Sequence, residues 1–383
     1  MSEMNLKLII MKQILCFIVI ILFSGCIEDY TPENIEEISD ILVVEGAITN
    51  GESVFKLRRS VGLMGELTGE EIADYAIVYV EIENSEPLPG IYNGNGTFVV
   101  QTGDLDVETR YRLFVDYQGE LYASEYMYPI ITPEIDSVSF APDREGDPVN
   151  VYVSTHDPNN QSKYFRWSYK EIWEAKAELV ADLVVVDGSM IEISLSSPHN
   201  TYYCWVRDSS KMMILESTEK LSENVIYQKK LTEIPVDNDR LSELYYINVE
   251  QTQISKEAFY YYSNLQKNIE QTGSIFAPMP NEIKGNIECI TNPNLMVIGF
   301  VDVSTTTQKK IFSNLKDYYV KPESSCLGAI TDVDFFYPEY AYIYYRGEGG
   351  NNTLYYAPHT CVDCRLKDGA TKNRPDFWPN DHN

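Results

Sequence analysis

The stretch ILVVEGAITNGESVFKL, residues 41–57, decides the fold class of this chain. Its first half, Ile41-Leu42-Val43-Val44-Glu45-Gly46, is rich in the β-branched and aliphatic residues that favour a strand. Asn50-Gly51 is a strong hairpin-turn signal, and Val54-Phe55-Lys56-Leu57 follows it as a second strand. The folded region is therefore predicted to begin with antiparallel β-structure.

Further short strands extend outward from this hairpin toward the C-terminus. They are predicted at residues 76–82, 97–100 and 111–117, with turn clusters at 87–90 and 93–96. Strands at this spacing, without a long helix between them, predict a β-sandwich over residues 41–132. Pro129 and Pro133 mark its expected boundary.

A larger β-rich domain is expected over residues 133–360. Its clearest strand is residues 164–173, in which aromatic residues of one parity share a sheet face: Phe165, Trp167, Tyr169 and Trp173. One packed helix is predicted near 255–272, with Ser255 as its N-cap and Gly273 at its end. The helix presents an apolar face of Ala258, Tyr261 or Tyr262, Leu265 and Ile269.

The N-terminus has the pattern of an export signal. Lys7 and Lys12 precede an apolar run at 14–23, and Phe23-Ser24-Gly25-Cys26 ends it with small residues. This resembles a bacterial lipobox, so residues 1–25 are predicted to be a signal peptide and Cys26 to be acylated. An ordinary signal or an anchor helix is the alternative. Residues 26–40 then form an acidic tether.

Glu28 and Asp29 follow the lipobox directly. They resemble the acidic signal that exports Bacteroidota lipoproteins to the outer face of the outer membrane. A solvated acidic linker would have the same composition. The expected location is the outer membrane, by a lipid anchor, on the cell-surface side.

The composition of the chain restricts the classes of molecule that it is expected to bind. The chain of 383 residues is 44% hydrophobic and 12% aromatic, so it is not composed like a disordered protein. Its formal net charge is −28. Such a charge repels phosphate backbones and anionic headgroups, which argues against nucleic acid as a partner. Tyr outnumbers Phe by 29 to 14, which suits half-buried strand positions.

Five cysteines follow Cys26: Cys204, Cys289, Cys326, Cys361 and Cys364. In an exported chain they are expected to pair. Cys361-Val362-Asp363-Cys364 also allows a zinc site with His359 and His382, or a thioredoxin-type redox pair. The favoured interpretation is structural, with Cys361 and Cys364 bridged to Cys204 and Cys326 so that the tail 361–383 is pinned to the body, and Cys289 left unpaired.

The tail ends in two large aromatic residues, Phe377 and Trp378, close to Pro375. Exposed, they would be an aggregation liability. They are expected to dock onto the tail's own domain. The alternative is that they anchor a partner surface, where tryptophan is a favoured contact residue.

Motifs of enzyme chemistry are absent from the sequence: it has no nucleophile elbow, P-loop, dinucleotide fingerprint or His-Glu-x-x-His. His156-Asp157 is interpreted as part of a turn, and Asp237-Asn238-Asp239 is a weak calcium candidate. Asp136-Ser137-Val138 resembles the Bacteroidota O-glycosylation sequon, which makes Ser137 a candidate acceptor. No catalytic residue, cofactor or metal is assigned.

Several segments together resemble the Bacteroidota lipoprotein family of domain of unknown function 4249 (DUF4249). In chain order they are residues 43–46 and 50–51, Arg166-Trp167-Ser168-Tyr169 with Glu171 and Trp173, Cys204-Trp205, Gly285-Asn286-Ile287, and residues 361–365, 368–369 and 372–378. The resemblance implies an N-terminal immunoglobulin-like domain, a larger β-rich domain and an outer-membrane lipoprotein. It also implies an accessory partner of TonB-dependent transporters.

The functional hypothesis is therefore a non-enzymatic, lipid-anchored outer-membrane protein that binds a transporter barrel or an extracellular nutrient. The ligand is not identified by the sequence. Two rivals are an adhesion or surface-scaffold module, because chains of sandwiches also serve there, and a glycan-active enzyme with an unrecognised acid pair.

Overall fold

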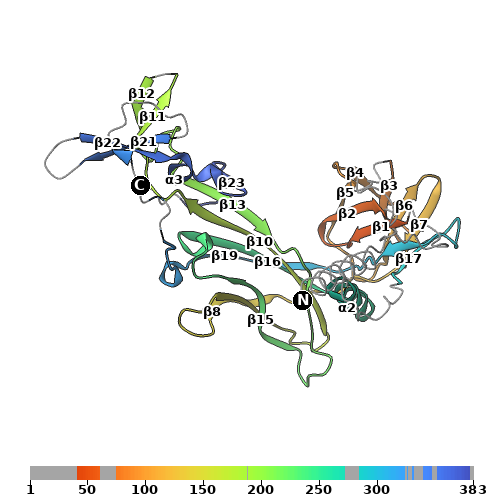
Figure 1. The fold of residues 1–383 in the computed structure, drawn as a ribbon. Coiled ribbons are helices and arrows are strands. Elements are labelled where there is room, and N and C mark those ends of the chain that lie inside the picture. Colours follow the sequence, from red (N-terminus) through yellow and green to blue (C-terminus); the bar gives the residue numbers. More distant parts are fainter. Residues whose placement is uncertain are drawn as a thin grey trace, which may run out of the picture. The chain divides into compact units, whose positions relative to one another are not determined.

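The computed structural model describes residues 41–60, 75–187, 189–271, 284–323, 326, 330–331, 340–346 and 352–379. This part of the chain is mainly β-structure with one long helix, as predicted (Figure 1). None of its helices is both long enough and apolar enough to span a membrane.

The first sandwich is built from a nine-stranded sheet in the order β17-β7-β6-β3-β4-β5-β2-β1-β18. Its strands are β1 (Leu42–Gly46), β2 (Gly51–Arg59), β3 (Ile77–Ile82), β4 (Leu88–Tyr92), β5 (Thr97–Gly103), β6 (Tyr111–Tyr117), β7 (Glu120–Ser124), β17 (Ile287–Cys289) and β18 (Val297–Gly299). The hairpin predicted around Asn50-Gly51 is present as the antiparallel pair β1–β2.

Strand β4 is where this sheet folds over into two layers. Its first residues pair with β3 and its last with β5, so Leu88 faces Val80 whereas Gly90 faces Val100. A Cβ on Gly90 would lie 2.8 Å from the carbonyl oxygen of Val78, so the fold-over needs glycine. Fully buried side chains of both layers then pack face to face, among them Phe55, Leu57, Val80 and Leu113.

Two strands of this sandwich come from far along the chain. β17 pairs with β7 and β18 pairs in parallel with β1, so segments distant in sequence lie side by side (Figure 1). Asn286 holds the returning segment: its amide accepts the Val301 N–H and donates to the Val301 carbonyl, both at 2.8 Å. The division expected at residue 132 is therefore incomplete, because residues 286–303 supply strands and core to the first domain.

The close backbone approach at this return explains Gly285. A Cβ there would lie 1.6 Å from the carbonyl oxygen of Gly299, which no side chain can satisfy. The Gly285-Asn286-Ile287 motif thus serves the packing of the returning segment.

The second sandwich packs a six-stranded sheet on a three-stranded one, in the orders β19-β16-β10-β13-β23, with β14 on β10, and β15-β9-β8. Its strands are β8 (Ile135–Pro142), β9 (Val149–His156), β10 (Tyr164–Lys176), β13 (Tyr203–Ser209), β14 (Ile214–Ser217), β15 (Val225–Ile234), β16 (Leu244–Gln253), β19 (Thr306–Asn314) and β23 (Ala370–Thr371).

The aromatic face predicted on residues 164–173 forms the core of this sandwich. Phe165 and Trp167 are buried in it, and Tyr169 and Trp173 pack against it. The indole of Trp167 donates to Gln251 Oε1 at 2.8 Å, and the Gln251 amide donates in turn to the carbonyl of Pro133. The buried polar groups at the centre are thereby paired.

The predicted helix is α2 (Lys256–Gln271). Ser255 caps it by accepting the Ala258 N–H, and the buried Asp302 accepts the Ser255 N–H at 2.7 Å. Burial raises the pKa of Asp302 to about 6. Ala258, Tyr261 and Tyr262 are buried as predicted, but Ile269 is 62% exposed, so the apolar face extends past the core it packs on.

The remaining elements are short strands and helices outside the two sandwiches. They are the hairpin β11 (Leu183–Val186) and β12 (Ser189–Glu192), the sheet β20 (Ile330–Thr331), β22 (Asn352–Pro358) and β21 (Tyr340–Arg346), the helices η1 (Asp239–Leu241), η2 (Lys316–Tyr318) and η3 (Cys364–Leu366), and α3 (His359–Val362). Gly273, the predicted helix end, lies outside the described residues.

Candidate functional site

A small polar pocket of about 280 Å³ lies in the second sandwich, between the start of the β13–β14 connection and β15. It is lined mainly by hydroxyl, charged and aliphatic side chains: Tyr169, Glu171, Asp208, Ser209, Ser210, Lys211, Met212, Ile214, Leu231, Thr232 and Arg240. The pocket is shallow and open to solvent, and its volume suits only a small molecule.

Glu171 forms the floor of the pocket and is only 1% exposed. Arg240 Nη1 donates to Glu171 Oε1 at 3.0 Å, and the Tyr245 hydroxyl donates to Oε2 at 2.6 Å. Burial raises the pKa of Glu171, and Arg240 and Tyr245 oppose that rise. Burial, and then the neighbouring Glu171, raise the pKa of Tyr245 well above its ordinary value. The carboxylate is thus held by two partners at the base of the cavity.

Arg240 is positioned by three neighbours. Its guanidinium lies 5.4 Å above the Trp173 ring, in cation–π geometry. Its backbone N–H is capped by Asn238 Oδ1 at 3.1 Å, and the adjacent Asp239 forms an ion pair with Lys367 of the tail. The loop considered as a calcium candidate therefore serves to hold Arg240, with Asn238 and Asp239 already engaged.

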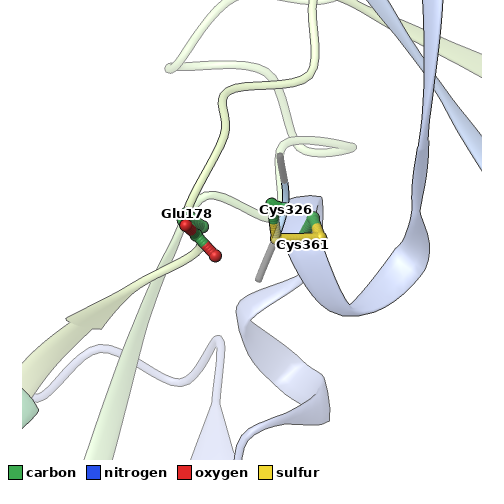
Figure 2. Close-up of side chains that lie close together, drawn as sticks. All are labelled: Glu178, Cys326 and Cys361. Carbon is green, nitrogen blue, oxygen red and sulfur yellow. A yellow bond between two sulfur atoms is a disulfide. The ribbon is translucent and has the colours of Figure 1, made fainter. Parts of the chain in front are cut away.

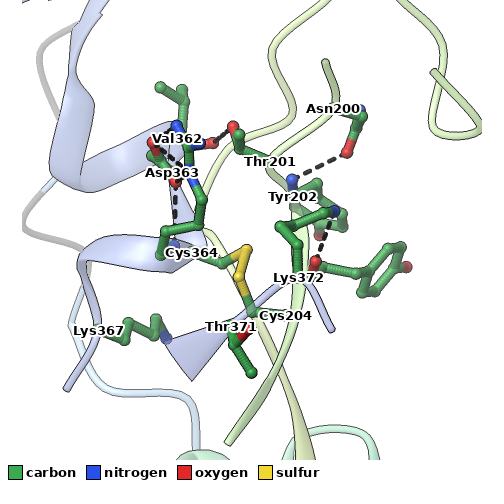
Figure 3. The surroundings of a disulfide bond; sticks show 12 residues. Asn200, Thr201, Tyr202, Cys204, Val362, Asp363, Cys364, Lys367, Thr371 and Lys372 are labelled. Atoms are coloured by element: carbon green, nitrogen blue, oxygen red, sulfur yellow. Dashed lines mark hydrogen bonds and ion pairs between the residues drawn. A yellow bond between two sulfur atoms is a disulfide. The ribbon is translucent and has the colours of Figure 1, made fainter. Parts of the chain in front are cut away.

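The C-terminal tail is clamped to the second sandwich by a disulfide between Cys204 of β13 and Cys364 (Figure 3). Hydrogen bonds flank it: the Cys364 N–H donates to the Thr201 carbonyl, and the Thr201 hydroxyl donates to the Val362 carbonyl at 2.9 Å. Lys372 reaches the Tyr203 carbonyl at 2.7 Å. The tail is thereby joined to the strand that borders the pocket.

A second disulfide joins Cys326 to Cys361 (Figure 2). Glu178 lies beside it, and these three residues are spaced like metal ligands. Both sulfurs are bonded to each other, however, so no thiolate remains for a metal. The structure thus pairs both cysteines of the Cys-x-x-Cys motif with upstream cysteines, as predicted, and Cys289 is buried and free.

Trp378 lies in a cluster with Trp205 and Tyr246 and is 4% exposed. Its ring also contacts Phe312, with ring centroids 5.2 Å apart. Phe377 lies over the same patch but remains 54% exposed. The prediction that the two aromatic residues dock onto their own domain therefore holds for Trp378. Phe377 covers the same aromatic cluster from the solvent side.

Trp378→Ala is expected to lower the free energy of unfolding by about 3 kcal/mol, because it removes a buried indole. Phe377→Ala, which removes a half-exposed ring, should cost about 1 kcal/mol. Denaturant unfolding of both variants measures the difference. Equal effects, or no effect of Trp378→Ala, would contradict the docked position.

The other predicted positions are scattered. Ser137 is exposed on β8, and His156, at the end of β9, pairs with Asp136 at 2.8 Å. Asp157 accepts the N–H groups of Asn159 and Gln161, as expected for turn chemistry. Cys26, Glu28 and Asp29 lie outside the described residues.

In the sequence, Glu171 stood out only as one residue of the family resemblance, and the pocket above this residue was missed. Arg240, Ser210 and Thr232 come from three separate elements, and no spacing in the chain joins them. The sequence feature that could have indicated the pocket is Glu171 itself, an acid within an aromatic strand, since a buried acid requires a partner.

Fold and site define a disulfide-clamped protein of two β-sandwiches, the second carrying a small polar pocket. The chain belongs to the family described as Domain of unknown function (DUF4249), whose model matches residues 27–310. The match includes the first sandwich and the pocket. The tail motif at 361–378 lies beyond it.

Other comparisons add little. No curated protein matches the chain. One similar solved structure is titled "Complete structure of manganese lipoxygenase of Gaeumannomyces graminis and partial structure of zonadhesin of Komagataella pastoris". It aligns at 10% identity over 58% of this chain and 91% of that chain, with a TM-score of 0.16. A similarity of that size supports no argument.

Proposed function

We propose that this protein is a lipid-anchored, surface-exposed outer-membrane lipoprotein of the Bacteroidota. It binds a small polar nutrient or a barrel partner and assists a TonB-dependent transporter. Cys26 would carry the lipid, and Glu28 and Asp29 the surface-export signal.

The observation that supports a binding role is that the Glu171 carboxylate, at the base of the pocket, is fully hydrogen-bonded. Both carboxylate oxygens of Glu171 are occupied, by Arg240 and Tyr245. Charge-assisted hydrogen bonds to both oxygens fix the carboxylate at the base of the pocket, and a fixed base suits ligand binding by the groups above it. The hydroxyl and ammonium groups at the mouth, those of Ser209 and Lys211, are exposed and remain to contact a ligand.

The proposed anchor predicts a change of location. Cys26→Ala should move the protein from the membrane fraction to the soluble one, because no acyl chain holds it. Fractionation followed by immunoblotting measures this. Unchanged membrane association of the Cys26→Ala variant would contradict the proposed lipid anchor.

The surface proposal has a separate test. Glu28→Ala combined with Asp29→Ala should leave the protein acylated and membrane-bound while abolishing its digestion by protease added to intact cells. A matched control replaces two acids further along the tether, Glu36 and Glu37, which should leave digestion unchanged. Retained digestion of the first variant would count against Glu28 and Asp29.

A further inference from the structure

The end of the first sandwich at which the described chain begins carries large exposed apolar side chains. They are Tyr75 at 93%, Ile77 at 61%, Ile290 at 51%, Met296 at 48% and Leu295 at 39% exposure. Exposed apolar side chains mark an interaction site where they gather at one place on a protein surface.

Strand register places these residues at one end. β18 runs parallel to β1 with Val297 beside Leu42, so Met296 and Leu295 lie next to Ile41, the first described residue. On the other layer, Ile77 pairs with Asp116, and Asp116 pairs with Leu121. The Leu121 carbonyl accepts the Ile290 N–H at 2.7 Å, which completes a row across four strands. Both layers thus present apolar side chains at the same end.

An apolar groove of about 780 Å³ adjoins this end. It runs between α2 and the segment from β17 to β18, and Leu265, Leu295 and Met296 are among its lining residues. The charged groups at its rim, Lys284 and Glu288, form an ion pair at 3.7 Å. The two charged groups at the rim of the groove therefore neutralise each other.

We propose that this end of the first sandwich, with Tyr75, Ile77, Ile290, Leu295 and Met296, contacts the bilayer interface beside the lipid anchor. The inference rests on the anchoring proposed above. Residues 27–40 join Cys26, the proposed lipid-bearing residue, to Ile41, which lies at the apolar end. Even fully extended, that tether reaches only about 50 Å.

The charge of the chain and the side chains at the apolar end indicate which class of lipid they would contact. The chain's net charge of −28 opposes adsorption to anionic lipids. Leu, Ile and Met contribute apolar burial, and tyrosine favours the headgroup level. The expected surface is therefore zwitterionic, and contact should be insensitive to salt.

Brominated lipids provide the test. The acylated protein, reconstituted in phosphatidylcholine vesicles with brominated chains, is compared as Met296→Trp and Val107→Trp. Both positions are 48% exposed. Val107 follows β5 at the opposite end, because Gly103 pairs with Gly51 whereas Arg59 pairs with Leu42. The tryptophan of the Met296→Trp variant should be quenched several-fold more than that of Val107→Trp, after subtraction of the parent protein's signal.

Equal quenching in the two variants would overturn the bilayer contact. The bilayer contact would also be overturned if the tryptophan of the Met296→Trp variant became shielded from solvent only when a transporter is added. Mass spectrometry of the parent protein reports acylation of Cys26 independently. Failure of the anchor and failure of the contact surface are therefore distinguished.

Discussion

Replacing both Cys204 and Cys364 by serine is expected to lower the free energy of unfolding by about 5 kcal/mol. This disulfide spans a sequence separation of 160 residues, so its loss frees a long loop in the unfolded chain. The Cys326–Cys361 disulfide spans 35 residues and should contribute about 4 kcal/mol on the same loop-entropy basis. The longer bridge should therefore be the more costly to remove.

Denaturant unfolding of the two double-serine variants measures these costs. Cys289→Ala is the control for loss of a cysteine without loss of a bridge, since Cys289 is free. Non-reducing peptide mapping identifies the bridges directly. A Cys204→Ser, Cys364→Ser variant within about 1 kcal/mol of the parent, or free thiols at both positions, would contradict the clamp.

Arg240→Ala is expected to cost about 3–5 kcal/mol at neutral pH, because it leaves a buried carboxylate without its cation. Arg240 is the cation that opposes the burial-driven rise in the pKa of Glu171, and its removal takes that opposition away. An acid whose pKa is raised in the folded state destabilises that state as pH rises through the folded pKa. The deficit should therefore be small near the unfolded pKa of about 4.3 and full above the folded one.

Unfolding of Arg240→Ala and the parent protein across pH 4.5–7.5 tests this dependence. Lys230→Ala is the matched control, because its ion pair with Glu233 is exposed, with side chains 46% and 57% accessible. That change should cost less than about 1 kcal/mol. A pH-independent deficit in Arg240→Ala would mean that Glu171 does not carry the buried charge.

Local signals in the sequence predicted much of the fold. Asn50-Gly51 marks the first hairpin, alternation in 164–173 marks the aromatic core face, and Ser255 marks the helix start. These features depend on neighbours in the chain, which is why the sequence alone reveals them.

The return of residues 286–303 to the first sandwich could not be predicted. β17 and β18 have three residues each, too short for a periodic signal. Their position depends on Asn286 and on the contact between Gly285 and Gly299, which are long-range features. The pocket was not predicted for the same reason, because Arg240 meets Glu171 only through tertiary packing.

Co-purification from the native host tests the proposed accessory role most directly. Full-length tagged protein, solubilised in detergent from outer membranes, is expected to carry a TonB-dependent transporter barrel in near-equal amount. Cys26→Ala, expressed at the same level, should carry none, because it is not held in the membrane beside the transporter. Quantitative mass spectrometry measures the amount of transporter recovered with each of the two proteins. Recovery of the acylated wild-type protein without any such barrel would contradict the proposed function.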